Sequence, residues 1–188
     1  IDKAKVALLA DGKVPIVEDG LDALVVGGLS SGNLCFTTDV VGAAATGEIV
    51  FLCLPTPQGD DGSADLSYVH SVVDQIGGIL PAGAVLVNKS TVPVGTGADV
   101  AARIGRDDVH IVSNPEFLRE GFAVEDFLRP ERVVIGSSSE RAIVMLKDLY
   151  EPFLQPGSKV IVMDEKSSEV TKYAANAFLA LKISYMND

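Results

Sequence analysis

The chain has 188 residues, of which 47% are hydrophobic and 22% charged, a composition typical of one globular domain with room for the start of a second. Its formal net charge of −11 argues against non-specific binding to nucleic acid, because such binding needs a basic face that neutralises phosphates. No apolar run reaches the roughly eighteen residues of a membrane span, so we expect none.

Apolar runs rich in Val and Ile alternate with helical patterns along the chain. In chain order we expect helices over 2–10 and 20–29, a strand over 48–54, a helix over 65–79, a strand over 85–87, a helix over 100–104, strands over 109–112 and 132–135, a helix over 140–149, a strand over 159–163 and a helix over 168–186. This alternation predicts an α/β fold, a doubly wound parallel sheet covered by helices on both faces.

One expected feature of a dinucleotide-binding domain is missing. Such a domain opens with a strand, a glycine-rich turn and a helix that receives the pyrophosphate. The sequence contains no G-x-G-x-x-G, and neither Gly27-Gly28 nor Gly95-Thr96-Gly97 links a leading strand to a helix at the right spacing. We therefore expect a Rossmann-like domain over 1–165 that lacks its first strand and glycine-rich loop, followed over 166–188 by the start of a long connecting helix.

The two cysteines and two histidines suggest no special chemistry. Cys35 and Cys53 lie in apolar, strand-like runs, so we expect two buried free thiols in a reducing cytoplasm rather than a disulfide or a reactive site. No His and Cys cluster has metal-ligand spacing, so no metal is expected, and His70 and His110 receive no role. No export leader opens the sequence, which favours a cytoplasmic location.

Polar residues follow the first two expected strands. Thr56 stands between two prolines that keep the backbone extended, and Lys89, Ser90 and Thr91 follow the next strand. Open α/β sheets bind ligands at this edge, so these donors and hydroxyls are candidates for a binding site. The alternatives are that the prolines simply end the strand and that Ser90 or Thr91 caps the following helix.

Two further pairs carry candidate chemistry. Glu116 and Glu120 face the same way if their segment is helical, and a carboxylate in such a half-apolar loop can have its pKa moved toward working pH, where it serves as a base. Lys172 and Asn176, four residues apart on the last expected helix, can stabilise an oxyanion or orient water. A solvated surface helix is the ordinary alternative for each pair.

Taken together, these segments carry a family resemblance. The order "PTP", "KSTVPVGT", "NPEFLREGFAVEDFLRPERVVIG" and "SSEVTKYAANAFLALKISYMND" closely resembles the N-terminal part of the UDP-glucose 6-dehydrogenase branch of the UDP-glucose/GDP-mannose dehydrogenase family. The opening "IDKAKVALLADGKVPIVEDGL" resembles the same family, so the match covers essentially the whole chain. It implies oxidation of the C6 hydroxyl of UDP-glucose to a carboxylate with two NAD and one water, through an adduct on a cysteine. That cysteine belongs to a later "G-G-x-C-x-P-K-D" motif, so we expect these residues alone to be inactive.

The resemblance also implies roles for residues of this chain. Glu116 and Glu120 would contact substrate and cofactor, with Glu120 as the general base for thioester hydrolysis. Thr91 would hold a water near the reacting carbon, Lys172 would stabilise an oxyanion, and Asn176 would bind a sugar hydroxyl or water. The residues that it implies at the nucleotide sugar are Glu116, Phe117, Leu118, Arg119, Glu120, Lys172 and Asn176. Those that it implies at NAD are Lys5, Thr56, Thr91 and Glu120.

Several alternatives stay open. GDP-mannose and UDP-N-acetyl-sugar dehydrogenases share the scaffold, although "REGFAVEDFLRPERVVIG" resembles the UDP-glucose branch more closely. A non-catalytic dinucleotide-binding or interaction module fits the missing nucleophile and phosphate loop, and a decarboxylating 6-phosphogluconate type shares the general architecture. Because the last helix of the family leads into a domain where subunits pair, the resemblance also implies a homo-oligomer.

Overall fold

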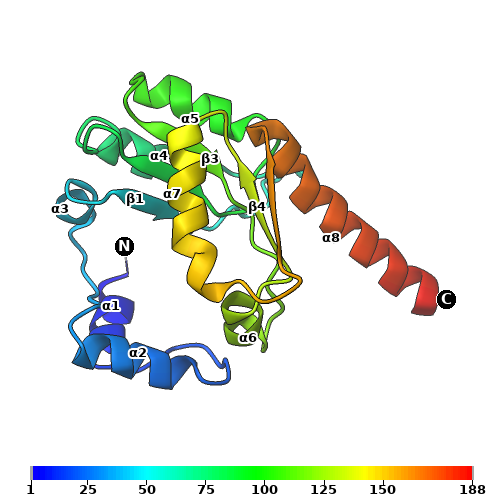
Figure 1. Ribbon diagram of the computed structural model, residues 1–188, viewed down its shortest axis with the longest axis horizontal. Coiled ribbons are helices and arrows are strands. Elements are labelled where there is room, and N and C mark those ends of the chain that lie inside the picture. The colour runs from blue at the N-terminus through cyan, green and yellow to red at the C-terminus, as the bar shows by residue number, and fades with distance from the viewer. Residues whose placement is uncertain (1, 188) are drawn as a thin grey trace.

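The computed structural model describes residues 2–187, which form a five-stranded sheet with helices on both faces (Figure 1). The strands lie in the order β1-β2-β3-β4-β5. Their bounds are β1 Ile49–Leu52, β2 Val85–Asn88, β3 His110–Ser113, β4 Arg132–Gly136 and β5 Lys159–Met163. All five expected strands and the α/β class are therefore confirmed.

The sheet differs from the expectation in one respect, because it is not wholly parallel. The pairs β1–β2, β2–β3 and β4–β5 are parallel, but β3 and β4 are antiparallel and share the single register pair Ser113 and Gly136. A parallel strand needs a crossover connection, usually a helix that returns the chain along a face of the sheet. The connection between β3 and β4 contains only the six-residue helix α6, so the chain turns back at the edge where β3 ends.

All six expected helices are present, and three short elements were not predicted. The bounds are α1 Lys3–Ala10, α2 Leu21–Ser30, α3 Val40–Ala44, α4 Ser67–Ile76, α5 Thr96–Ile104, α6 Ala123–Leu128, α7 Glu140–Tyr150, a 3-10 helix η1 at Glu151–Phe153, and α8 Glu165–Asn187. The unpredicted elements are α3, α6 and η1, which are too short to show helical periodicity in the sequence. The predicted end of the last segment, Asp188, lies outside the described residues.

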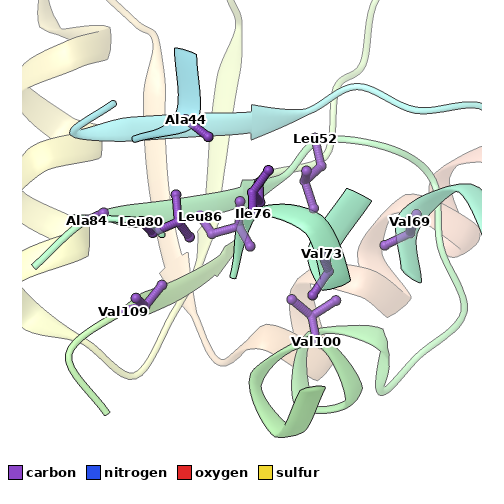
Figure 2. Packing of buried hydrophobic residues seen from close by; sticks show 10 residues of the cluster. All are labelled: Ala44, Leu52, Val69, Val73, Ile76, Leu80, Ala84, Leu86, Val100 and Val109. Carbon is purple, nitrogen blue, oxygen red and sulfur yellow. The ribbon is translucent and has the colours of Figure 1, made fainter. Parts of the chain in front are cut away.

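The core consists of two apolar clusters, one on each face of the sheet. Helices α4 and α5 cover one face, where their side chains contact Leu52 and Leu86 of the sheet (Figure 2). Helix α7 covers the other face, where Leu146 packs among residues that include Val85 and Val87. Successive residues of β2 point to opposite faces, and helices cover both faces. This strand is therefore buried along its whole length, which explains its apolar sequence.

Helices α1 and α2 stand apart from the sheet (Figure 1). No residue of α1 is buried, and Val25 is the only buried residue of α2. The apolar side chains of α1 are only partly covered, since Leu8 is 38% exposed. This segment contributes little to either core cluster.

The cysteines are free, as expected, but both are exposed, so the expectation of buried thiols is wrong. Residues 34–36 form no strand, which leaves Cys35 in an irregular segment. Strand β1 ends at Leu52, so Cys53 lies one residue beyond it. An apolar run thus marked the neighbourhood of a strand without placing these side chains in its core.

Helix α8 is the longest element and extends away from the sheet (Figure 1). Its buried residues are Ser168, Glu169 and Lys172, all polar and all in its first eight positions. Beyond them, large apolar side chains such as Phe178 and Ile183 are more than half exposed. Within residues 2–187, no helix combines the length and apolar character needed to cross a bilayer.

Candidate functional site

The loops that follow β1 and β2 are joined to each other by side-chain hydrogen bonds. The Ser90 hydroxyl accepts the Leu54 N–H at 2.8 Å and lies 2.7 Å from the Leu54 carbonyl oxygen. The Thr56 hydroxyl donates to the Thr91 carbonyl oxygen at 2.9 Å. The two threonines predicted at NAD are therefore neighbours.

The alternative that Ser90 or Thr91 caps the next helix is not met. Helix α5 begins at Thr96, four residues earlier than predicted, and its N-cap is Gly95. Gly95 has φ 99°, a left-handed backbone that favours glycine. The hydroxyl of Ser90 therefore organises the strand-end loops, and the helix N-terminus is satisfied by another group.

The segment after β3 is a loop, so Glu116 and Glu120 do not share a helical face, contrary to the expectation. Pro115 disfavours a helical conformation in the residue before it. The Glu116 carboxylate accepts the Leu118 N–H at 2.7 Å, a local bond that competes with helix formation. Glu116 is half-buried, whereas Glu120 is exposed.

Helix α8 brings Lys172 to this loop. The Lys172 ammonium donates to the Glu116 carbonyl oxygen at 2.6 Å and to the carboxylate Oε1 at 2.7 Å. The side chains are 9% and 31% exposed, respectively, so the pair is largely shielded from water. Two residues 56 positions apart thus meet.

The charge state of Glu116 differs from the expectation of a carboxylate whose pKa is moved toward working pH. Burial by itself raises the pKa of Glu116, but the hydrogen bonds from Lys172 and Leu118 and the charges of Lys172 and Lys89 outweigh it and hold the pKa below its usual value. Glu116 is therefore ionised near neutral pH and serves as a hydrogen-bond acceptor rather than a proton donor.

Lys89, a predicted donor at the strand ends, forms a network beside this pair with Asn114 and Tyr150, two residues without a predicted role. Lys89 donates to the Asn114 side-chain oxygen and to the Tyr150 hydroxyl, each at 3.1 Å, and the Tyr150 hydroxyl donates to the same Asn114 oxygen at 2.6 Å. Asn114 in turn donates to the Val134 carbonyl oxygen at 2.8 Å, which joins β3 to β4 at their antiparallel junction.

Burial perturbs both titratable members of this network. Desolvation lowers the pKa of Lys89 to about 8 and raises the pKa of Tyr150 to about 12. The position of Lys89 directly after an apolar strand is the signal that marked it as a candidate. Tyr150 ends an amphipathic helix and Asn114 follows a strand, and neither position distinguishes a functional side chain from a structural one.

A cavity of about 520 Å³ lies against this network. Its lining includes four of the residues predicted at the nucleotide sugar, and these are Glu116, Phe117, Leu118 and Arg119. The Phe117 ring lies 4.4 Å from the Arg132 guanidinium and 5.4 Å from the Lys172 ammonium, so cations flank it. The Arg119 guanidinium is paired with Asp126 at 2.7 Å.

Some predicted residues lie farther from this cavity. Asn176 is exposed one turn beyond Lys172 on α8, and Glu120 is exposed at the turn that precedes α6. Lys5 is exposed on α1, and Figure 1 shows α1 and α8 at opposite sides of the molecule. The structure thus brings Glu116, Phe117 and Lys172 together but leaves Lys5 apart.

The strand ends offer groups that fit part of a dinucleotide. Asn88, the last residue of β2, is 3% exposed, and within residues 2–187 neither polar atom of its side chain has a hydrogen-bond partner. Together with Thr56 and Thr91 it presents donors and acceptors of the kind that bind a carboxamide and a ribose. Among the same residues, no group of three or more His, Cys, Asp and Glu side chains could hold a metal ion.

Comparisons with known proteins show what this chain is similar to. The family described as "UDP-glucose/GDP-mannose dehydrogenase family, NAD binding domain" matches residues 1–154. The UDP-glucose 6-dehydrogenase of Pseudomonas aeruginosa is 47% identical over all of this chain, which spans 43% of that protein. The similar solved structures include a GDP-mannose dehydrogenase from P. aeruginosa, with a TM-score of 0.91 and 31% identity over 100% of this chain and 45% of that one. They also include a UDP-glucose dehydrogenase from Pyrobaculum islandicum, with a TM-score of 0.90 and 39% identity over 98% of this chain and 44% of that one.

Proposed function

Because the chain belongs to the UDP-glucose/GDP-mannose dehydrogenase family and carries its NAD-binding domain, we propose that the complete protein oxidises the C6 hydroxyl of UDP-glucose to give UDP-glucuronate. NAD, when bound, accepts a hydride. The observation that supports this function best is the contact between Lys172 and Glu116 beside the cavity. A binding module has no need for a shielded ammonium and carboxylate at that point.

The donors of Lys172 give it a specific role in this proposal. An ammonium has three N–H groups, and Glu116 accepts from it at two oxygens, which leaves one donor for a substrate oxygen. A donor that is fixed in advance stabilises negative charge as it develops on that oxygen. Glu116 keeps the ammonium oriented.

The other predicted residues complete the proposal. Thr91 would hold a water near the reacting carbon, and Asn176 would bind a sugar hydroxyl or water one turn along α8. Glu120, which is exposed, would act as the general base, and Thr56 would contact the nicotinamide half of NAD. Phe117, Leu118 and Arg119 would line the nucleotide-sugar site. The family's adduct-forming cysteine would come from outside these residues.

UDP-glucose is preferred over other nucleotide sugars because the UDP-glucose 6-dehydrogenase relative is 47% identical, whereas the GDP-mannose dehydrogenase structure is 31% identical. GDP-mannose and UDP-N-acetyl sugars are the alternative substrates. A non-catalytic module is the alternative from another class, and the Lys172 and Glu116 pair disfavours it.

The proposal extends to the assembly and location of the complete protein. The segment 166–188 would begin a central helical domain through which subunits pair. Exposed apolar residues on α8, such as Phe178 at 62% and Leu181 at 64%, support this arrangement. A cytoplasmic location would keep Cys35 and Cys53 reduced.

Turnover of the complete protein tests the function. The expected result is NAD reduction with UDP-glucose at a kcat/KM well above that with GDP-mannose or UDP-N-acetylmannosamine, and none from residues 1–188 alone. Lys172→Met should lower kcat by about 100-fold or more, as removal of an oxyanion donor does. Lys166→Met, which removes an exposed lysine from the same helix, is the matched control. No NAD reduction with any of the three sugars would contradict the proposal.

A further inference from the structure

Glu169 is a buried carboxylate that the proposed chemistry does not use. It is 3% exposed, and a charge so far from water requires strong partners. Its two oxygens accept the N–H groups of Gly95 at 2.6 Å and of Gly97 at 2.8 Å. Both donors belong to the start of α5, more than 70 residues earlier in the chain.

The start of α5 explains why this site attracts a carboxylate. The first N–H groups of a helix have no partner within it, and the helix dipole places partial positive charge there. The N-cap of α5 is Gly95, which has no side chain to satisfy these groups. Glu169 supplies that missing cap from another helix, so one carboxylate joins α8 to α5.

Neighbouring contacts on α8 fix the same face of the helix. The Ser168 hydroxyl donates to the Ser113 carbonyl oxygen at 3.1 Å, and Glu165 accepts from the Ser138 N–H at 2.8 Å. A Cβ on Gly136 would lie 2.3 Å from the Ser168 Cβ, so this close approach requires glycine. These contacts hold the first turns of α8 on the sheet, and Glu169 is the charged member of the set.

We propose that Glu169 is a positioning residue, which sets the rotation of α8 so that Lys172 reaches Glu116. Residues three apart lie on one face of a helix, so a side chain anchored at 169 fixes the direction of the side chain at 172. Lys172 then makes both of its bonds to Glu116. Any catalytic value of that pair rests on the proposed function, but the positioning itself does not.

The accessibility of the Lys172 amine tests this proposal in the chain as it stands. Acylation by an amine-specific reagent is followed by mass spectrometry in wild type, Glu169→Gln and Glu169→Ala, under conditions where circular dichroism shows each variant folded. Loss of a buried, charged hydrogen-bond acceptor predicts acylation of Lys172 about tenfold faster in Glu169→Ala. Glu169→Gln, which keeps the length and one acceptor, should give an intermediate rate and carries the test if Glu169→Ala does not fold.

Two controls separate positioning from general loosening. Lys89 is anchored by Asn114 and Tyr150, not by α8, so its acylation rate should stay within about twofold of wild type. Glu140→Gln changes an exposed carboxylate on α7 and should alter neither lysine. Faster exchange of the Gly95 and Gly97 amides with an unchanged Lys172 rate would show that Glu169 is only a cap, and equal acceleration of both lysines would also overturn the proposal. Neither readout depends on turnover.

Discussion

Helices α2 and α7 have a similar share of apolar residues but differ in what they bury. Helix α7 buries Ala142, Leu146 and Tyr150, which recur at four-residue intervals and form one stripe against the sheet. Helix α2 buries Val25 alone, and Leu24 and Val26 on either side of it are each 49% exposed. Burial therefore follows the spacing of apolar residues and the presence of a facing surface, not their number.

The α1–α2 segment is nevertheless tied to the candidate site by one side chain. The Glu18 carboxylate accepts the N–H groups of Gly121 at 2.8 Å and of Ala123 at 2.9 Å, just before and within α6. A carboxylate thus anchors this segment to the loop that contains Glu116, as Glu169 anchors α8 to α5. The two regions differ in core packing but share this way of fixing a loop.

The largest expected effect lies in the sheet region. Leu146→Ala removes a side chain with no exposure from the cluster under α7, and the resulting cavity should lower the free energy of unfolding by about 3 kcal/mol. Leu24→Ala on α2 is the matched control and should change it by less than about 0.5 kcal/mol. Chemical denaturation of both variants measures the difference. Equal losses would mean that α2 packs as tightly as α7.

The second prediction concerns the buried charge of the sheet region. Because the pKa of Lys89 is lowered from 10.5 to about 8, the unfolded chain binds a proton between these pH values that the folded chain has released. The free energy of unfolding of wild type, relative to Lys89→Met, should therefore rise between pH 8 and 10.5, by up to about 3 kcal/mol. Denaturation across this range measures it. A flat or falling difference would contradict the burial of this charge.

The smallest expected effect sharpens the link between the regions. Glu18→Gln weakens two charge-assisted bonds at a half-buried position and should lower the free energy of unfolding by about 1 kcal/mol. The Gly121 and Ala123 amides should exchange faster with solvent, as amide exchange by NMR would measure. Asp19→Asn, at the exposed neighbouring residue, is the control. Unchanged exchange at both amides would show that the segment does not hold the loop.

Local sequence determined most of the elements of this protein. Five short apolar runs became five strands, and helical periodicity marked α4, α7 and α8, because each pattern depends on residues close in the chain. The position of Lys172 and Asn176 on one helix followed from the same periodicity. The family was also readable from motif order, since "NPEFLREG" and the segments around it are specific as a set.

Tertiary structure alone decided how these elements meet. The antiparallel β4, the non-helical loop at Glu116 and the pairing of Lys89 with Tyr150 depend on partners up to 61 residues apart. The carboxylate of Glu169 shows the same limit, because a helix position predicts a face but not what lies opposite. Periodicity encodes which side of an element is apolar, whereas contacts between distant polar groups arise only when packing brings the elements together.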